Sequence, residues 1–443
     1  PDRTTRDWIR SLPFRFTGDQ QGATAVIASE LGGAAPMRRL LMGEVGSGKT
    51  VVALMAMLRT AESGAQAAFM APTAVLAEQH AATIGRLLEG TGIRPALLTG
   101  DTPKPAREAM LKALSAGELD LIVGTHALLE DRVAFKRLAL CVVDEEHRFG
   151  VRQRAQLNAK APTGKSAHIL HMSATPIPRT LSLTTYGDLD VTTLRELPSG
   201  RLPVRTELAR ESGRAAIFDR VREELDLGRQ CFVVCPLVEE SEQLEARAAT
   251  TEAERLAEGE LKGYEVGLLH GRMSPAQKEI AMAAFVDGRI DVLVATTVIE
   301  VGIDVPNATM MVIEGAERFG LSQLHQLRGR VGRGEHGGTC FLLPGSDGVR
   351  SRRRLAELAR EPDGFRLAEI DLEMRGEGEI TGTRQHGLPR FAVASLPRDS
   401  ELLTAARADL DRIGPGAEYD LLLRTATARF GSEDEASTRR EPR

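Results

Sequence analysis

The sequence predicts an α/β fold with two parallel sheets in tandem, followed by a mostly helical C-terminal extension. Short apolar segments rich in β-branched residues alternate with longer helical patterns, as in βαβ units covered by helices on both faces. The alternation occurs in two successive series, and a glycine-rich loop follows the first apolar segment directly. These observations predict two α/β lobes.

Ten segments carry the strand pattern. In the first series they are residues 40–42, 67–71, 119–124, 140–144 and 168–172. In the second series they are residues 230–236, 266–269, 291–295, 309–314 and 339–343. Beyond about residue 343 the strand pattern stops. Helices are expected at 350–361, ending before Pro362, and at 399–413, with Asp399 or Ser400 as the N-cap.

The boundary between the lobes is expected at 197–204, where two prolines and a glycine indicate a connector. The expected domains are a first lobe at 1–198, a second lobe at 199–345, a helical and loop-containing region at 346–430, and a polar, disordered tail at 431–443.

The composition is that of an ordinary globular protein of 443 residues, 42% hydrophobic and 27% charged. The longest apolar runs are far shorter than a membrane span, and no secretory signal is visible. The chain begins at Pro1 rather than Met, so a fragment or a processed chain is expected. The net charge of −5 argues against a nonspecific nucleic-acid coat protein, although an acidic molecule can still contain a basic channel.

The four cysteines, Cys141, Cys231, Cys235 and Cys340, are too few and too scattered for a disulfide scaffold. Cys231 and Cys235 lie on one predicted strand, about 13 Å apart, which is too far to bridge. No second pair of ligands occurs at metal spacing, so a zinc site is not expected. A reduced, cytoplasmic setting fits this pattern.

The first motif with a chemical meaning is LMGEVGSGKT at residues 41–50. It fits G-x-x-x-x-G-K-[ST], and it stands between a strand and a helix as a phosphate-binding loop does. Lys49 is expected to reach the β- and γ-phosphates of a nucleotide, and Thr50 to bind Mg²⁺. The other residues expected to surround the nucleotide phosphates are Gly43, Gly46, Ser47 and Gly48.

A second motif, LALCVVDEEHRFG, ends a predicted buried strand with acidic residues. The carboxyl end of a parallel strand faces the ligand crevice. Asp144 is therefore expected to bind nucleotide-associated metal, and Glu145 to orient an attacking water. His147 follows the acidic residues and is a candidate for coupling the nucleotide to the second lobe.

The second series ends with QLHQLRGRVGR at 323–333. Arg330 and Arg333 are expected to stabilise the transferring phosphate from across a cleft. The alternative is a basic face that binds nucleic acid, and Arg328 is compatible with both interpretations. A nucleotide held between two lobes would make lobe closure depend on phosphate state, which predicts a motor rather than a kinase.

The ordered motifs carry a family resemblance. GEVGSGKT, APTAVLAEQH, GTHALL, DEEH, SATPIPRTL, LHGRM, ATTVIEVGIDVPNA and QLRGRVGR together resemble the superfamily-two helicases, whose lobes are RecA-like. DEEHRFGVRQR, SATPIPRTLSLTTYGDLD, ELPSGRLPV and DGFRLAEIDLEMRGEGEITGTRQHG are similar to the RecG family of bacterial fork-remodelling, branch-migrating DNA translocases. The resemblance covers roughly residues 12–413.

The resemblance implies roles at matching positions. Gln20 would read the adenine of ATP, since its amide can pair with a donor and acceptor edge. Ser173 and Thr175 would link the nucleotide site to DNA. Residues near the cleft from the second lobe would be Thr297, Gly302 and Asp304. Contacts to DNA phosphates, which carry no sequence information, would come from Thr73, Thr125 and Arg272.

RGEGEITGTRQHG at 375–387 resembles the hairpin-and-loop element that couples ATP hydrolysis to movement on duplex DNA in this family. Its glycines suit a loop that changes shape between states. The candidate coupling residues are Arg375, Arg384 and Gln385.

Two departures from the family stand out. Glu146 occupies a position where RecG members usually carry glutamine and the transcription-repair coupling translocase carries glutamate. The RecG motor is preceded by an oligonucleotide-fold wedge domain, whereas this sequence starts almost at the motor. Two alternatives are expected: the wedge was removed, or this relative works without one.

The sequence therefore predicts an ATP- and Mg²⁺-dependent double-stranded DNA translocase or helicase. It would remodel stalled replication forks and branch-migrate Holliday junctions in DNA repair and recombination. Branched duplex DNA is the expected partner, with single-strand DNA-binding protein as a further candidate, and the expected state is a cytoplasmic monomer that contacts no membrane. The alternatives are a transcription-repair coupling translocase and a non-hydrolysing, ATP-gated DNA-binding module.

Overall fold

The computed structural model describes residues 3–145, 160, 166–176, 189–198, 203–210, 213–236, 242–296, 305–334, 336–345, 348–380, 400–413, 416, 419–422 and 424–425. Packing of the backbone separates the chain into two compact units. The first contains both sheets, and the described residues of the second lie in the last part of helix α13 and beyond it.

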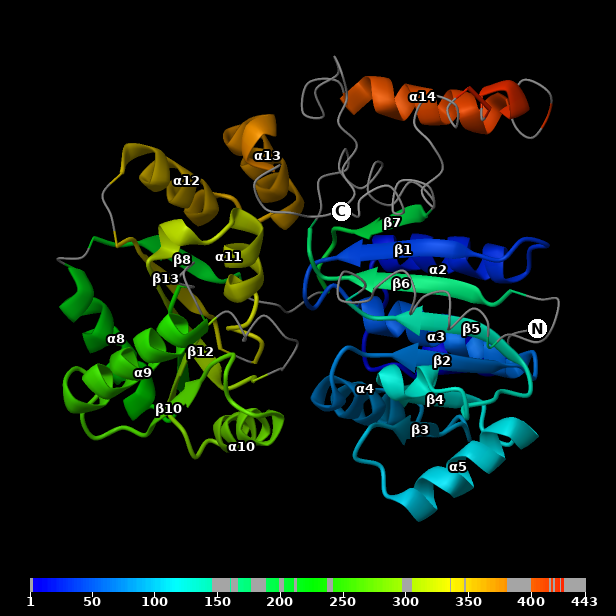
Figure 1. Cartoon of the computed structure of the whole chain (residues 1–443), viewed down its shortest axis with the longest axis horizontal. Coiled ribbons are helices and arrows are strands. Elements are labelled where there is room, and N and C mark those ends of the chain that lie inside the picture. The colour runs from blue at the N-terminus through cyan, green and yellow to red at the C-terminus, as the bar shows by residue number, and fades with distance from the viewer. Residues whose placement is uncertain are drawn as a thin grey trace, which may run out of the picture. The chain divides into compact units, whose positions relative to one another are not determined.

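The first sheet contains seven parallel strands in the order β3-β4-β2-β5-β6-β1-β7 (Figure 1). Their bounds are β1 Arg38–Gly43, β2 Gln66–Met70, β3 Pro95–Leu98, β4 Leu121–Gly124, β5 Leu138–Val143, β6 His168–Ser173 and β7 Asp190–Leu194. Strand β6 lies between β5 and β1, and Met42 pairs with Ser173. The loops after β1 and β5 and the end of β6 therefore meet at one edge of the sheet, where parallel sheets bind ligands.

The second sheet contains six parallel strands in the order β10-β11-β9-β12-β13-β8. Their bounds are β8 Arg205–Leu208, β9 Gln230–Val234, β10 Val266–Leu269, β11 Val292–Ala295, β12 Ala308–Glu314 and β13 Thr339–Leu343. The fold prediction of two tandem parallel-sheet lobes is confirmed, and all ten predicted strands are present.

Strands β3, β7 and β8 were not predicted. Each lies at an edge of its sheet and is mostly half-buried or exposed. An edge strand needs apolar residues on fewer sides, so its sequence lacks the continuous apolar run of the central strands.

The helices alternate with these strands. Their bounds are α1 Arg3–Ser11, α2 Gly18–Leu31, α3 Lys49–Glu62, α4 Ala74–Leu87, α5 Lys104–Ala116, α8 Arg214–Asp226, α9 Glu242–Glu258, α10 Pro275–Val286, α11 Leu321–Arg328, α12 Val349–Arg360, α13 Gly364–Ile380 and α14 Ser400–Ile413, with short 3₁₀ turns η1 His126–Leu129 and η5 Ala316–Arg318. The predicted helix before Pro362 is α12, and the helix predicted at 399–413 is α14. Both predictions are confirmed.

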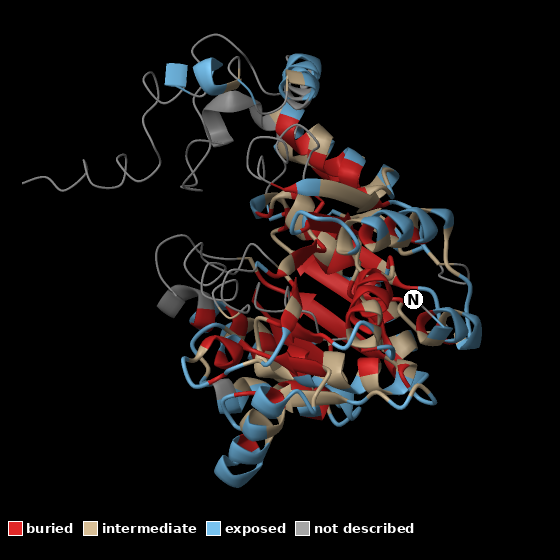
Figure 2. Ribbon diagram, turned by 90° about the vertical axis from the view of Figure 1, so that its right-hand side faces the viewer, coloured by how far each residue is buried: buried red, intermediate tan, exposed pale blue. Residues whose placement is uncertain are grey.

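Each sheet is covered on both faces, because neighbouring residues of one strand belong to different apolar clusters. Phe69 and Val142 join the cluster around α3, whereas Met70 and Val143 join the cluster on the opposite face. Figure 2 shows the strands among the buried segments. Helix α3 is buried along most of its length, so the phosphate loop before it is anchored in the core of the first lobe.

Helix α13 corrects the expectation of a loop at 375–387. The helix continues to Ile380, so residues 375–380 are helical and not part of a loop. Asp363 precedes its first residue, and Asp363 Oδ1 accepts the backbone N–H groups of Phe365 and Arg366 at 2.7 and 3.3 Å. The Glu, Met and Arg residues around the two glycines favour helix and offset a cost of about 1 kcal/mol for each glycine. Residues 381–387 lie outside the described part.

The four cysteines are buried free thiols, and burial raises the pKa of Cys141 to about 12. Within the described residues, no group of three or more His, Cys, Asp or Glu side chains could hold a metal ion. Over the same residues, no helix is both long enough and apolar enough to span a bilayer.

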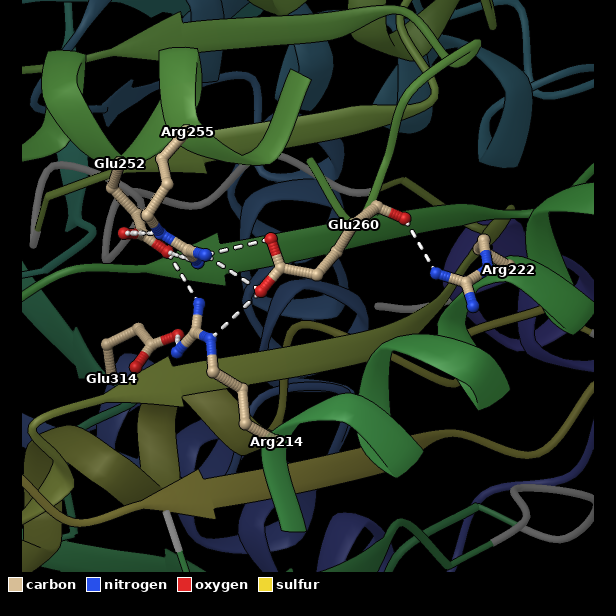
Figure 3. Close-up of polar contacts among 6 residues, drawn as sticks. All are labelled: Arg214, Arg222, Glu252, Arg255, Glu260 and Glu314. Carbon is tan, nitrogen blue, oxygen red and sulfur yellow. Dashed lines mark hydrogen bonds and ion pairs between the residues drawn. The ribbon is translucent and has the colours of Figure 1, made fainter. Parts of the chain in front are cut away.

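An ion-pair network joins the helices of the second lobe (Figure 3). Arg214, the first residue of α8, contacts Glu252 on α9 at 2.7 Å, Glu260 at 3.3 Å and Glu314 at the end of β12. Arg255 contacts the same Glu252 and Glu260, both at 2.7 Å. Burial lowers the pKa of Arg214, but the attraction of Glu314 and Glu252 outweighs burial, and the pKa lies above its ordinary value.

Replacing Arg214 with Met should lower the free energy of local unfolding of the second lobe by about 2–3 kcal/mol, since the substitution leaves Glu314 and its neighbours with less positive charge. Hydrogen exchange of the amides of β9 and β12 measures this change. Arg289→Met is the matched control, because the pair of Arg289 with Asp287 is exposed on both sides (64% and 60%) and contributes under about 1 kcal/mol.

The difference in the free energy of local unfolding between wild type and Arg214→Met should also depend on pH. Burial raises the pKa of Glu260, but the contacts with Arg255, a backbone hydrogen bond and the hydrogen bond from Arg214 together outweigh burial, so the pKa lies below its ordinary value. The stability from this group is present above about pH 4 and is lost as the pH falls further. Two results would contradict the role of the network. One is an equal loss of hydrogen-exchange protection in Arg214→Met and Arg289→Met. The other is a stability difference between wild type and Arg214→Met that persists unchanged at acid pH.

Candidate nucleotide site and its connections

The phosphate loop runs from the end of β1 to the start of α3, as its motif predicts. Gly46 and Gly48 have φ values of 83° and 84°, which favour glycine. A Cβ on Gly43 would approach Ser47 Oγ to 2.4 Å, and one on Gly48 would approach Gln20 Nε2 to 2.2 Å. The loop therefore needs glycine both for its backbone conformation and for its close packing.

Lys49 is nearly buried, with 9% of its surface exposed. Its Nζ donates to the carbonyl oxygens of Gly43 at 2.8 Å and Glu44 at 3.0 Å. Burial lowers the pKa of Lys49 to about 8. Asp144 and Glu145 act to raise this pKa, and Arg330 and Arg333 act to lower it. Charges from both lobes therefore reach one ammonium group.

The loop has the donors that a phosphate chain needs. Ser47 Oγ is fully buried and has no hydrogen-bond partner among the described residues. A buried hydroxyl without a partner is costly, and a phosphate oxygen would satisfy it. The residues present thus fit a nucleotide with its metal ion, with Thr50 and Asp144 as candidate ligands of that ion.

The acidic residues lie at the end of β5, beside the loop. Asp144 is buried, and its Oδ1 accepts the N–H of Glu145 at 3.1 Å. Glu145 is the one non-glycine residue in the described part of the chain with a positive φ, 52°. Such a conformation costs on the order of 1–3 kcal/mol and often occurs at functional sites. The strain at Glu145 supports its predicted role without testing it.

Gln20 contacts the back of the phosphate loop. Its Nε2 donates to the Ser47 carbonyl at 2.8 Å, and its Oε1 accepts the Thr17 N–H at 3.0 Å in a capping box at the start of α2. One amide hydrogen and one lone pair remain for another partner. The predicted adenine contact stays a prediction, and Gln20 has a structural role in the loop that the sequence did not suggest.

Contacts between the lobes pass through helix α11, which ends at Arg328 just before Arg330 and Arg333. Gln326 Nε2 donates to Thr175 Oγ1 at 2.5 Å, and Ser173 Oγ accepts the Thr175 N–H at 3.2 Å. The segment at the end of β6 is thus in direct contact with the second lobe, in line with the predicted linking role of Ser173 and Thr175. Arg333 Nε donates to the Gly329 carbonyl at 2.9 Å, and Arg330 is 4% exposed.

The interpretation of Arg328 as part of a nucleic-acid face is wrong. Arg328 is 7% exposed, and its guanidinium donates to the carbonyls of Leu358, Glu361 and Pro362 at 2.8–3.0 Å. These bonds connect α11 to the end of α12 and to the segment between α12 and α13. The guanidinium also contacts His325 Nδ1 at 2.6 Å.

Glu44, inside the phosphate loop, meets both of these elements. Its Oε1 accepts the backbone N–H of Gly364, the first residue of α13, at 2.7 Å and lies 3.1 Å from His325 Nε2. Burial raises the pKa of Glu44, but the contacts with His325 outweigh burial and hold it below its ordinary value. A Cβ on Gly364 would come within 2.3 Å of His325 Nε2 and 2.7 Å of Pro176. The junction therefore requires glycine.

The residues predicted to touch DNA phosphates differ in accessibility. Thr73 is half-buried and caps α4, accepting the Leu76 N–H at 3.3 Å. Thr125 is 3% exposed and caps η1, so a phosphate could reach its hydroxyl only after local rearrangement. Arg272 is exposed and lines a surface pocket of about 380 Å³ with Arg247 and His270, completed by Ala246, Thr250 and Thr251.

Several predicted residues cannot be placed. His147, Thr297, Gly302, Asp304, Arg384 and Gln385 lie outside the described residues, as does the side chain of Arg375. Their predicted roles stay predictions.

Three known protein families match successive parts of this chain. The DEAD/DEAH box helicase family model matches residues 20–184, the helicase conserved C-terminal domain matches 216–335, and the C-terminal part of domain 3 of the ATP-dependent DNA helicase RecG matches 361–421. The last match falls on α13 and α14 and discriminates among helicases of this fold.

Similar proteins align with this sequence over most of its length. The ATP-dependent DNA helicase RecG of Synechocystis sp. is 50% identical over 396 residues, covering 89% of this chain and 47% of that protein. RecG of Thermotoga maritima is 47% identical, covering 93% and 52%. A solved structure of RecG bound to a three-way DNA junction superposes with a TM-score of 0.76 at 45% identity, covering 90% and 51%.

The chain belongs to the RecG helicase family. It spans about half the length of the curated RecG relatives it matches. The RecG match covers the phosphate loop, α11 and α13, which are the three elements joined at Glu44.

The sequence did not indicate three contact residues of this RecG-type motor. They are Glu44, His325 and His80, whose Nε2 lies 2.8 Å from Asp144 Oδ2. His80 was visible only as part of the APTAVLAEQH segment. His80 lies four residues after the buried Leu76 and four before the buried Ile84, so all three share one face of α4. A histidine at an otherwise apolar position of a helix face indicates that its ring has a polar partner inside the protein.

Binding of a non-hydrolysable ATP analogue should weaken above about pH 8, by up to tenfold per pH unit. The pKa of Lys49 is about 8 in the free protein, and a bound phosphate favours the charged form and raises this pKa. Binding therefore takes up a proton where free Lys49 is neutral. Calorimetry in buffers of different ionisation enthalpy measures both quantities.

Lys49→Met is the control, since it removes the titrating group. The variant should bind weakly, with an affinity that does not change across pH 7–9.5. An unchanged affinity of the wild type over this interval would show that Lys49 does not titrate there.

Proposed function

We propose that this chain is the motor of an ATP-dependent double-stranded DNA translocase that remodels branched DNA, such as stalled forks and Holliday junctions, in repair and recombination. The observation that carries the proposal is the site around Lys49. There, two acidic residues of the first lobe and two arginines of the second lobe act on one buried ammonium. Membership of the RecG family supports DNA as the substrate.

In the proposed hydrolysis step, each residue has one task. Lys49 and the N–H groups of the loop hold the phosphate chain, and Glu145 orients the attacking water. Arg330 and Arg333 stabilise the charge that develops on the transferring phosphate. Mg²⁺, held by Thr50 and Asp144, would neutralise phosphate charge.

Coupling to DNA would start at Glu44. The same loop that holds phosphates bonds to His325 on α11 and to the backbone of α13. A change in phosphate occupancy would therefore alter a contact that holds the start of α13. Arg384 and Gln385 follow α13 in the sequence, and we propose that they act on duplex DNA.

DNA binding by the second lobe would use the surface pocket at Arg272. Arg247 and Arg272 line it together, with threonine hydroxyls at its wall. Such groups suit a sugar-phosphate backbone and would carry no sequence preference. We further propose that the protein acts as a monomer in the bacterial cytoplasm, with single-strand DNA-binding protein as a partner.

The proposal is tested by steady-state ATPase at fixed salt with no DNA, single-stranded DNA, linear duplex, a four-way junction and RNA. Strong stimulation by duplex and junction is expected. Stimulation by single strands or RNA alone would contradict a duplex translocase, and ATP binding without turnover would indicate an ATP-gated binding module.

Replacing Arg333 with Ala should leave the affinity for a non-hydrolysable ATP analogue within a few-fold of wild type and lower kcat by about 10³. The reason is that the arginine acts on charge that develops only in the transition state. Rapid-quench turnover and fluorescent analogue binding measure the two quantities. Arg318→Ala, at an exposed position of the same lobe, is the control. Unchanged hydrolysis in Arg333→Ala would assign the stabilisation of the transferring phosphate to Arg330 instead.

Replacing Glu44 with Ala should uncouple hydrolysis from movement. DNA-stimulated ATPase should stay within about threefold of wild type, because Lys49 bonds the carbonyl of Glu44 and not its side chain. Displacement of a triplex strand per ATP should fall about tenfold, since a charge-assisted contact of roughly 1.5–3 kcal/mol is lost. Glu108→Gln on exposed α5 is the control.

Gly364→Ala offers an independent test of the same junction, because a Cβ there would displace His325. It should reproduce the uncoupling of Glu44→Ala. Normal displacement in both variants would mean that the Glu44 contact is only structural.

A further inference from the structure

His80 is a half-buried polar residue on α4, and no step of the proposed hydrolysis uses it. Its Nε2 lies 2.8 Å from Asp144 Oδ2. The side chains are 16% and 12% exposed. The imidazole also packs against Phe69, with ring centroids 4.5 Å apart. The ring is therefore held between the end of β2 and the end of β5.

This contact orders the Asp144 carboxylate. Oδ2 accepts from His80, and Oδ1 accepts the N–H of Glu145. Each carboxylate oxygen has further lone pairs, so both bonds leave room for a cation. Partners of this kind fix the orientation of metal-binding carboxylates, and their loss typically weakens metal binding 10–100-fold.

The same contact ties Asp144 to the start of α4. The backbone N–H of Asp144 donates to the carbonyl of Met70, the last residue of β2, and α4 begins shortly afterwards with Thr73 as its cap. His80 lies seven residues beyond Thr73, two turns along one rigid helix, or about 10 Å. A displacement of the helix start would therefore reach the carboxylate through His80.

We propose that His80 is a positioning residue that holds the Asp144 carboxylate for a divalent cation and connects it to α4. The inference rests on the proposed function for the identity of that cation as the nucleotide's Mg²⁺. DNA contact at the start of α4 would then favour the orientation of Asp144 that binds the metal. His80 touches neither nucleotide nor DNA in this role.

The experiment compares three substitutions at position 80. His80→Ala removes the contact. His80→Gln can place its amide nitrogen near the position of Nε2 and donate to Asp144, whereas the shorter His80→Asn places its nitrogen near Nδ1 and cannot. Glu78→Gln, exposed and two residues away on the same helix, is the control.

The first readout is equilibrium binding of a fluorescent non-hydrolysable ATP analogue, titrated with Mg²⁺. His80→Ala and His80→Asn should raise the Mg²⁺ concentration for half-maximal binding by about tenfold or more. His80→Gln should stay within about threefold of wild type. Binding of the analogue without Mg²⁺ should be the same in all variants.

The second readout is the DNA stimulation of ATPase at saturating Mg²⁺. The ratio of kcat with duplex to kcat without it should fall in His80→Ala, while the Kd for duplex stays unchanged. A merely structural His80 would lower Tm in all three substitutions and leave the Mg²⁺ midpoint and the stimulation ratio unchanged.

The outcomes separate the two proposals. Wild type without DNA-stimulated ATPase contradicts the proposed function. An active wild type with an unchanged or lower Mg²⁺ midpoint in His80→Ala overturns the role of His80 alone. Equal defects in His80→Gln and His80→Asn would also overturn it, because the donated bond at Nε2 would then not matter.

Discussion

The rest of the structure depends on the burial of one ammonium group at the end of a central strand. Removing the charge of Lys49 from water costs several kcal/mol. Two loop carbonyls and two acidic residues of the first lobe offset that cost, while two arginines of the second lobe oppose it. The site is therefore poised to take up a polyanion, which would satisfy Lys49 and both arginines together. The groups of the first lobe lie at one edge of the sheet because β5, β6 and β1 are parallel neighbours.

Short polar side chains carry the connections away from this site. Glu44 contacts α11 and α13, and Thr175 contacts α11. Both involve carboxylate, amide or hydroxyl groups that are partly buried, where one hydrogen bond is worth more than at the surface. Arg328 then holds the segment between α12 and α13 through three carbonyls. Arg328, whose sequence context suggested binding to nucleic acid, thus connects parts of the second lobe to one another.

The two carboxylates of the phosphate site have different surroundings. Asp144 is oriented by His80 and by the Glu145 N–H, whereas Glu145 is held with a left-handed backbone. One is fixed by partners and the other by backbone strain. This difference suits their proposed tasks, since a metal ligand must keep one orientation and a residue that orients water must project into the site.

The sequence by itself determined the fold class, the central strands, the phosphate loop and the acidic strand end, because these depend on local patterns and fixed spacings. It did not determine the edge strands β3, β7 and β8, whose half-exposed residues lack such a pattern. Only the tertiary structure decided the internal role of Arg328 and the contacts of Glu44 and His80. Each of these depends on a partner between 30 and 320 residues away in the chain, and no local pattern encodes which distant group a polar side chain will meet.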